Sequence, residues 1–482
     1  MSERPELPDG LALIVKRDCA TCRLVEPVMA DVTERFDGPV TVYSQDDPEF
    51  PESITGVIHD DDLAVSWHHD IETVPTVIRV HDGTEVERAV GWLRDDWERV
   101  TGIAGLGPDL PDFRPGCGSL SVDPDRVDEL RARHGGSVLR SRRVEAAAAE
   151  DEAEVFFSRG WTDGLPVVPP TEERVLRMLT GTPRAPDEFV AAVPPDLVEC
   201  TVEKVAINAV MAGCLPEHMP VVLTAVEAAC TDAFNMHGLI ATTWFSGPVV
   251  MVNGPIAERI RMNSGHNCLG QGNRANATIV RALQLVVRNV GGGRPGEIDK
   301  ATLGQPGKYT QCFAEREHDS PWEPYHVSQG IPADRSAVTL FAGGGVQGVF
   351  DQLSREPESL CRTFAECLRV VASPKMAIGF DAMLVVSPEH ARVFREAGWS
   401  RDELLQRLTE LLTVPGTEVV RGARGIAEGL PEAFAGVDIP KFRPGGLLVV
   451  HAGGGAGLFS AIIGGWASGD LGSTPVTQEV SA

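Results

Sequence analysis

Two cysteines near the amino terminus form the most reactive pattern in the chain. Cys19 and Cys22 follow an apolar run, Leu11 to Val15, that is typical of a buried strand. A Cys-x-x-Cys pair at a helix start favours redox chemistry, because the unpaired N–H groups and partial positive charge there stabilise a thiolate. The pair could instead be half of a zinc site, but no second pair with ligand spacing follows in the sequence. We therefore predict a thiol–disulfide function.

The elements that must position these cysteines can be read from the next eighty or so positions. Pro27 lies five residues after Cys22, and Pro75 enters a β-branched run, Thr73 to Val80. The elements expected after it are a turn at His81 to Thr84, a strand from Glu85 to Val90 and a helix from Leu93 to Thr101. This order resembles the thioredoxin superfamily. The resemblance implies a helix kink at Pro27 and a cis-proline, Pro75, packed against the disulfide. Pro75 is also a candidate substrate contact.

Two positions depart from that family. Asp18 stands where the family usually has Trp, and apolar Leu13 replaces a carboxylate that is common on the first strand. A negative charge beside Cys19 is expected to raise the pKa of that thiol, against the effect of the helix start. We therefore predict a domain tuned to one internal client rather than a general reductase.

The composition bounds the class of protein. The chain has 482 residues and a formal net charge of −26, so it is long enough for several domains. The charge disfavours nucleic acid and anionic membranes as partners, because phosphates would be repelled. The sequence contains neither an apolar run of membrane-spanning length nor a signal-peptide core in Met1 to Gly10, so we expect a cytoplasmic protein. Most of the cysteines should then be reduced and buried.

A third candidate thiol follows the first domain, which we place at residues 1–105. Residues 106–145 are predicted to be a linker with a short helix, because the stretch from Gly102 to Pro115 is rich in glycine and proline. Cys117 stands between two glycines, which would let a bulky partner approach its sulfur. The linker would let Cys117 reach the Cys-x-x-Cys pair. The alternative is a turn with an incidental cysteine.

Residues 146–482 are predicted to form a larger α/β domain with a mostly parallel or mixed sheet. The expected strands are Pro248 to Asn253, Ala337 to Phe341, Ala382 to Val386 and Leu447 to Val450. Two of them run into glycine-rich segments that contain Gly344 and Gly454. Such loops can bring bare backbone N–H groups against an anion, so both glycines are candidate ligand contacts. Tight turns are the alternative.

Two polar groups in the large domain are candidate sites. Trp161 and Asp163 lie in a loop rich in proline and glycine that could hold a substrate or wrap the domain surface. Glu203, Lys204 and Asn208 form a polar stripe on an otherwise apolar helix. A Glu–Lys pair in apolar surroundings can be tuned for proton transfer, and a structural ion pair is the alternative.

The densest cluster of reactive side chains runs from Asn263 to Asn276. Here His266 could act as acid or base, Cys268 as a second nucleophile, and Arg274 as a carboxylate clamp, with Asn276 as a substrate contact. A later polar and aromatic stretch should border the same site; it contains Arg294, Lys308, Tyr309, Cys312, Glu317, Trp322, Glu323 and His326.

Cofactors are weakly indicated. The scattered histidines and cysteines of the large domain, His451 among them, lack short metal-ligand spacing, so no cofactor is predicted and a metal is the weaker alternative. The large domain also resembles uncharacterised bacterial proteins that carry Trp-Thr-Asp-Gly-Leu-Pro and Gly-Asn-Arg-Ala-Asn-Ala-Thr motifs. That resemblance names no reaction.

These features predict a thiol-dependent enzyme that acts on a small anionic organic substrate by reductive cleavage or sulfur transfer. The Cys19 and Cys22 pair would be its built-in reductant or sulfur relay. A metal- or acid/base-dependent lyase or hydrolase with an accessory thioredoxin-like domain is the alternative, and a redox-responsive binding protein is a third. We also expect a homo-oligomer, and an external thiol reductant as a further partner.

Overall fold

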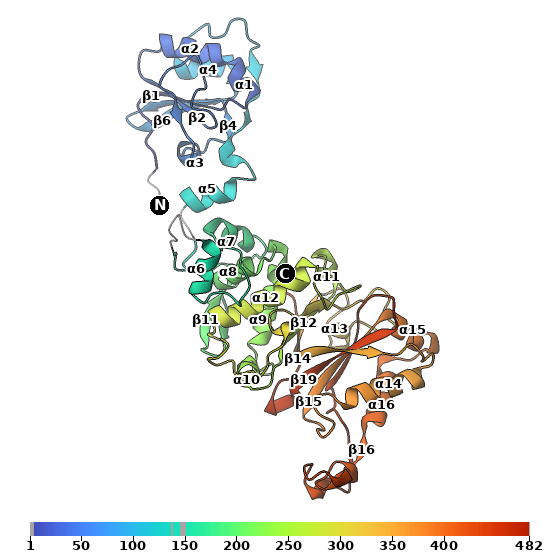
Figure 1. The fold of residues 1–482 in the computed structure, drawn as a ribbon. Coiled ribbons are helices and arrows are strands. Elements are labelled where there is room, and N and C mark those ends of the chain that lie inside the picture. Colours follow the sequence, from blue (N-terminus) through green and yellow to red (C-terminus); the bar gives the residue numbers. More distant parts are fainter. Residues whose placement is uncertain (1–3, 136–137, 145–150, 482) are drawn as a thin grey trace. The chain divides into compact units, whose positions relative to one another are not determined.

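The computed structural model describes residues 4–135, 138–144 and 151–481. These fall into two compact units, Met1–Arg140 (unit 1) and Ser141–Ala482 (unit 2) (Figure 1). The predicted boundary between residues 145 and 146 lies outside the described residues.

Unit 1 is built on a five-stranded mixed sheet of order β3-β2-β1-β5-β6. Strands β1, β2 and β3 are parallel neighbours, and β5 and β6 are added antiparallel. The strands are β1 Gly10–Val15, β2 Val40–Ser44, β3 Ile58–His59, β4 Thr73–Val74, β5 Thr76–His81, β6 Thr84–Val90, β7 Trp92–Leu93, β8 Phe113–Arg114 and β9 Cys117–Gly118. The helices are α1 Ala20–Leu24, α2 Glu26–Arg35, α3 Ala64–His68, α4 Arg94–Thr101 and α5 Val127–His134, with a 3₁₀ turn at Leu120–Val122.

The local predictions for the first domain are confirmed. Helix α1 ends before α2 begins, and Pro27 is the second residue of α2, where proline costs no hydrogen bond. The Val74–Pro75 peptide bond is cis. Asp82 and Gly83 have positive φ in the two-residue turn between β5 and β6, as a hairpin of this type requires. Leu13 is fully buried in the middle of β1, opposite Val42 and Val77, and packs in the core.

The segment expected to be a linker is more ordered than its composition suggests. Strand β8 pairs with β7, β9 pairs with β4, and helix α5 follows, so unit 1 extends to Arg140 rather than ending near residue 105. Backbone hydrogen bonds order this segment in spite of its glycine and proline content, because each short strand pairs with another strand of the domain.

Unit 2 contains a seven-stranded mixed sheet of order β13-β12-β14-β19-β15-β18, with β20 also paired to β14. The mixed sheet, one of the two forms predicted, is confirmed. The strands of this sheet are β12 Gly247–Asn253, β13 Cys312–Ala314, β14 Ala337–Phe350, β15 Phe380–Val386, β18 Leu447–His451, β19 Phe459–Ala467 and β20 Val476–Glu479. Two small antiparallel sheets of two strands each add β10 Phe189–Val193 with β11 Val198–Thr201, and β16 Val414–Pro415 with β17 Asp438–Ile439.

Helices flank this sheet (Figure 1). They are α6 Glu152–Ser158, α7 Glu172–Leu179, α8 Val202–Ala212, α9 Met219–Ala229, α10 Met236–Ala241, α11 Pro255–Arg259, α12 Arg274–Asn289, α13 Tyr325–Ser328, α14 Pro357–Arg369, α15 Pro388–Ala397 and α16 Arg401–Leu412. Helices α14, α15 and α16 bury their apolar faces against β15, β18 and β19. Helix α9 packs against β12 and β14, and α12 packs against β12 and β13.

Apolar side chains on one face of the sheet pack against one another. Side chains from β12, β13, β14, β15, β18 and β19 form one apolar cluster, so the sheet is curled. Its two edges meet where the backbone N–H of Arg316 donates to the carbonyl of His451 at 2.7 Å. The curl therefore brings together the segments that follow β13 and β18.

The expected glycine loop around Gly344 is wrong. Gly343 to Gly345 lie inside β14, where the ladder with β19 shifts register between Gly343 and Val346. A Cβ on Gly343 would lie 2.5 Å from Val249 and 2.8 Å from Ile463, so the glycine is needed for close strand packing rather than for an anion. Gly344 itself is buried in the strand.

No helix in the described part of the chain is both long and apolar enough to cross a membrane.

Candidate functional site

Cys19 caps the amino terminus of α1. Its Sγ accepts a hydrogen bond from the backbone N–H of Cys22 at 3.3 Å and lies 3.5 Å from the carbonyl oxygen of Val74. Cys19 and Cys22 are both buried. The strand that ends at Val15 delivers the chain to this point, as the sequence predicts. The pair therefore sits at a helix start inside the domain.

The two thiols differ in acid strength. Hydrogen bonds from the thiols of Cys22 and Cys117, together with backbone N–H groups, lower the pKa of Cys19 to about 5, although burial opposes the shift. Burial, and next to it the neighbouring Cys19 sulfur, raise the pKa of Cys22 far above its usual range. At neutral pH Cys19 is therefore the thiolate and Cys22 keeps its proton. This difference makes Cys19 the nucleophile.

The predicted influence of Asp18 on the pKa of the Cys19 thiol is not among the main causes of its shift. Asp18 is exposed, and its backbone N–H donates to the carboxylate of Asp46 at 2.8 Å. The pKa of Cys19 falls because hydrogen bonds from thiols and backbone N–H groups outweigh the other influences on it. Water screens an exposed carboxylate, whereas the donors to Cys19 are buried with it.

Cys117 lies beside this pair. Strand β9 pairs antiparallel with β4, so that Cys117 is opposite Val74 and Gly118 is opposite Thr73. Burial raises the pKa of Cys117, and its hydrogen bond to Cys19 adds to this effect. The structure thus brings the third predicted thiol to the nucleophile, and exchange between them stays a prediction.

Several contacts hold the Cys117 segment in place. The hydroxyl of Thr21 donates to the carbonyl of Pro115 at 2.6 Å, and the side-chain amide of Gln45 donates to Ser119 Oγ at 2.6 Å. A Cβ on Gly116 would lie 2.4 Å from Thr73 Cγ2, whereas one on Gly118 would meet nothing within 4 Å. Gly116 therefore permits the approach of β9 to β4.

Pro75 follows Val74 directly, and its carbonyl accepts a hydrogen bond from the N–H of Gly91 at 2.8 Å. It therefore lies next to the backbone that β9 pairs with. A substrate contact by Pro75 stays a prediction.

In unit 2, Asn276 organises the loop that precedes α12. Its buried side chain accepts from the N–H of Asn263 at 3.0 Å and donates to the carbonyls of Asn263 at 2.9 Å and Cys268 at 3.1 Å. Cys268 is buried, and this burial raises its pKa to about 11. The geometry therefore disfavours Cys268 as a nucleophile and gives Asn276 a structural role.

His266 and the second glycine loop come together. The His266 ring is exposed and packs against Gly454, where a Cβ would lie 2.1 Å from its Nδ1. The N–H of Gly453 donates to the carbonyl of Ser264 at 2.9 Å. Acid–base chemistry at His266 and ligand contact at Gly454 stay predictions.

Arg274 has contacts that differ from the predicted carboxylate clamp. Its Nε donates to the carbonyl of Gly213 at 2.8 Å and one terminal nitrogen to that of Cys214 at 3.4 Å. The guanidinium thus binds carbonyl groups just after α8. A role for Arg274 in substrate binding stays a prediction.

Glu203, Lys204 and Asn208 make separate contacts rather than one proton-transfer group. The Lys204 ammonium donates to the carbonyl of Glu199 at 2.8 Å, and the buried Glu203 carboxylate accepts a backbone N–H at 2.8 Å. Asn208 accepts from Asn289 at 2.9 Å and thereby joins α8 to α12. The side chains of Glu203 and Lys204 have different partners because successive residues of a helix point in different directions.

The loop with Trp161 and Asp163 is bound to α12. Asp163 forms a bidentate ion pair with Arg281 at 2.8 and 2.9 Å, and their side chains are 13% and 14% exposed. The same guanidinium donates to the carbonyl of Pro166 at 2.9 Å, and Asn289 donates to that of Trp161 at 3.1 Å. These contacts favour the structural alternative for the loop.

Arg316 and Asp319 form a polar group with His451 that sequence reasoning missed. The Arg316 guanidinium holds the Asp319 carboxylate with two hydrogen bonds of 2.7 Å and lowers its pKa to about 2. His451 is buried, its Nδ1 donates to the carbonyl of Val386 at 2.9 Å, and its Nε2 lies 3.4 Å from Asp319. Only the curl of the sheet brings these segments together, so no local spacing could have identified the group.

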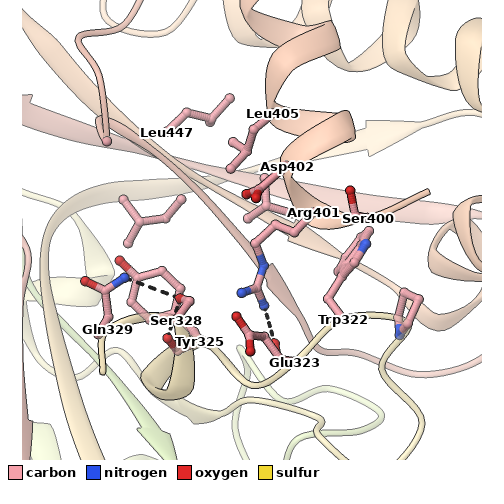
Figure 2. Close-up of a pocket in the computed structure, with 14 residues that line it drawn as sticks. Trp322, Glu323, Tyr325, Ser328, Gln329, Ser400, Arg401, Asp402, Leu405 and Leu447 are labelled. Atoms are coloured by element: carbon pink, nitrogen blue, oxygen red, sulfur yellow. Dashed lines mark hydrogen bonds between the residues drawn. The ribbon is translucent and has the colours of Figure 1, made fainter. Parts of the chain in front are cut away.

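A cavity of about 530 Å³ opens beside β18 (Figure 2). It is lined by Pro321, Trp322, Glu323, Tyr325, Ser328, Gln329, Ser400, Arg401, Asp402, Leu405, Gly445, Leu447, Leu448 and Val449. The Arg401 side chain is 10% exposed, donates to the carbonyl of Glu323 at 2.6 Å and lies 3.6 Å from the buried carboxylate of Glu315. The predicted polar and aromatic stretch supplies part of this wall, whereas α16 and β18 come from distant sequence.

A metal centre gains little support. Within the described ranges, the one group of three side chains close enough to share an ion is Asp9, His81 and Asp82, and all three are exposed. None of them is a predicted site residue, and exposed acidic groups commonly bind nothing.

Comparison with known proteins bears on unit 1. The amino-terminal part of the chain is similar to a thioredoxin H-type protein from Picea mariana, with 32% identity over 81 residues, or 17% of this chain. The matched part spans only 54% of that relative. No protein-family model matches the chain. The amino-terminal domain is therefore thioredoxin-like, and it precedes a larger α/β domain.

Proposed function

We propose that unit 1 carries out thiol–disulfide exchange between the Cys19 and Cys22 pair and Cys117. The pairing of Cys117 with Val74 carries this proposal, because it puts a third thiol in hydrogen-bond contact with the nucleophile. The similarity to a thioredoxin supports the redox part. In the whole protein, unit 1 would be the built-in reductant of a thiol-dependent enzyme.

The exchange has two steps. First the Cys19 thiolate attacks the sulfur of Cys117 in a mixed disulfide or persulfide. A bond forms between Cys19 and Cys117, and the other sulfur leaves as a thiolate or as hydrosulfide. Cys22 then loses its proton and attacks Cys19, and Cys117 leaves and takes up a proton. Two electrons pass from the pair to the original disulfide, and an external thiol restores the pair.

The electrostatics of the pair favour this order. While Cys19 is a thiolate, its sulfur helps to keep the pKa of Cys22 high. Bond formation at Cys19 removes that negative charge, so deprotonation of Cys22 becomes easier when it is needed.

The substrate of the whole protein would be a small anionic organic molecule bound by unit 2. If the substrate forms a disulfide with Cys117, the reaction is a reductive cleavage. If the Cys117 thiolate first takes sulfane sulfur from the substrate, the substrate leaves as an anion and Cys117 becomes a persulfide. That step is a sulfur transfer to Cys117, and the exchange at Cys19 then releases the sulfur as hydrosulfide. Both use the same exchange at Cys19.

Trapping of the mixed disulfide tests the proposal. In the full chain, Cys22→Ser blocks the second step, so mild oxidation should join Cys19 to Cys117, as mass spectrometry of the digested protein would show. Adding Cys117→Ser should abolish that link, and adding Cys367→Ser, at a half-buried cysteine of unit 2, should not. A link from Cys19 to another protein, with Cys117 still free, would contradict the proposal.

An acid/base-dependent lyase or hydrolase is the second candidate. The buried His451 supports it, because Nδ1 donates to a carbonyl and leaves Nε2 to accept a proton next to Asp319. In that case unit 1 is an accessory domain, and turnover of the substrate should survive Cys19→Ser but not His451→Gln.

A further inference from the structure

The cavity beside β18 combines an apolar wall with a buried cation. Leu405 and Leu447 contribute apolar side chains, and the largely buried ring of Trp322 lies at the other side. Its volume of about 530 Å³ lies within the range of small-molecule pockets. In Figure 2 the guanidinium of Arg401 lies beside Glu323, with Trp322 to one side and the two leucines above.

Arg401 is the one cation among the residues that line the cavity. Its Nε is fully enclosed, so a ligand in the cavity would reach the part of the guanidinium that leaves the side chain 10% exposed. The Glu323 carbonyl and the Glu315 carboxylate, which lies 3.6 Å away, both lie against one terminal nitrogen of the guanidinium and hold it in place. A carboxylate is the group that matches a guanidinium best.

The cavity also carries negative charge. The side chains of Glu323 and Asp402 line it and are exposed. Together with Arg401 they give the lining one positive and two negative groups. Such a lining repels a phosphate or a dicarboxylate and attracts an ammonium group. A ligand with one carboxylate and one ammonium satisfies both signs.

We propose that this cavity binds a small zwitterion with an apolar side chain, of the class of α-amino acids. The carboxylate binds Arg401, the ammonium faces Glu323 and Asp402, and the apolar side chain packs on Leu405 and Leu447. The site is independent of the thiol chemistry of unit 1, so the failure of either proposal leaves the other standing.

Calorimetric titration of the full chain with matched compounds tests the proposal. L-Phenylalanine and L-leucine are the zwitterions, 3-phenylpropanoate lacks the ammonium, and 2-phenylethylamine lacks the carboxylate. At least one amino acid should bind saturably, and each phenyl analogue should bind at least about tenfold more weakly than L-phenylalanine or, if only leucine binds, not at all. Equal or tighter binding of 3-phenylpropanoate would overturn the proposal, and so would the absence of saturation by either amino acid.

Variants locate the site. Arg401→Gln should weaken amino-acid binding at least about tenfold, whereas Arg392→Gln, at an arginine of α15 whose side chain is 54% exposed, should not change it. Gln329→Trp adds bulk at an exposed position of the lining and should block binding without touching Arg401. Circular dichroism and thermal melting check that each variant folds. If Arg401→Gln does not fold, the Gln329→Trp variant tests the proposal in its place. Unchanged affinity in the Gln329 variant would overturn the proposal.

Discussion

At the scale of the residue, the acidity of Cys19 is set by hydrogen bonds from two thiols and two backbone N–H groups to one sulfur. The thiol of Cys22 is the strongest of them, and the thiol of Cys117 acts in the same direction. Burial alone would raise the pKa, as it does for Cys268 and for Cys214. Hydrogen bonding to the charged form therefore outweighs desolvation at this one cysteine.

The reactivity of Cys19 should follow this acidity. Because its pKa is about 5, alkylation of the full chain by iodoacetamide should rise with a midpoint near pH 5 and be constant around neutral pH. Digestion and mass spectrometry give the rate for the Cys19 peptide alone. A midpoint near the usual cysteine pKa of about 8.5 would contradict the assignment of Cys19 as the thiolate.

The contribution of Cys117 can be separated from that of the helix start. Cys117→Ala removes a hydrogen bond to the Cys19 thiolate, so the midpoint for alkylation of Cys19 should move to higher pH. Cys367→Ala, which removes a distant half-buried thiol, is the control and should leave the midpoint unchanged. The same midpoint in both variants would mean that Cys117 does not act on Cys19.

At the scale of the element, short strands do the positioning in unit 1. Strand β9 contributes only two residues to its pairing with β4, yet that register sets Cys117 opposite Val74. In unit 2, one ion pair fastens the loop of Asp163 to α12. Both contacts join segments that are far apart in the chain.

The close approach of β9 makes a specific prediction for the glycines around Cys117. In Gly116→Ala the new methyl group would collide with Thr73 and with the carbonyl of Val74, so β9 should leave β4. Alkylation of Cys117 should accelerate, and the alkylation midpoint of Cys19 should rise. Gly118→Ala meets open space and is the matched control. Equal alkylation rates in the two variants would contradict this packing.

The ion pair between Asp163 and Arg281 should matter for stability. Asp163→Ala leaves a largely buried guanidinium without its carboxylate, so the free energy of unfolding should fall by about 3 kcal/mol. Glu173→Ala, in an exposed pair with Arg177, should cost less than about 1 kcal/mol. Urea unfolding of unit 2 measures both, and equal losses would show that burial of the pair is unimportant.

At the scale of the whole molecule, the chain divides into two units of very different size, and the three-thiol group lies entirely within the first. Neither the exchange at Cys19 nor the cavity at Arg401 needs side chains from the other unit. The boundary after Arg140, rather than near residue 105, is what keeps Cys117 with its partners.

This boundary predicts how fragments behave. A fragment of residues 1–140 should fold and keep the low alkylation midpoint of Cys19, because it retains β8, β9 and α5. A fragment of residues 1–105 lacks the Cys117 donor and the strand that covers β4, so its midpoint should be higher. Circular dichroism confirms folding in each case. Identical midpoints would place the functional boundary at residue 105.

Local patterns in the sequence determined the parts of this protein that depend on near neighbours. The Cys-x-x-Cys pair at a helix start, the break at Pro27, the turn at Asp82 and Gly83, and the buried strands of both units are all set by residues a few positions apart. Backbone geometry and hydrophobic periodicity act over that range, so these elements were predictable.

Only the tertiary structure decided which distant residues meet. The glycines near Gly344 suggested a loop, but a strand formed because β12 and β19 pack closely on either side. The pairing of Cys117 with Val74 and of Asp163 with Arg281 depends on how the chain folds back, and the curl of the sheet alone brings Arg316 to His451. Such contacts depend on packing across the whole unit, which no local spacing encodes. The Cys-x-x-Cys motif could therefore be recognised in the sequence, whereas the position of Cys117 beside it is defined only by the tertiary structure.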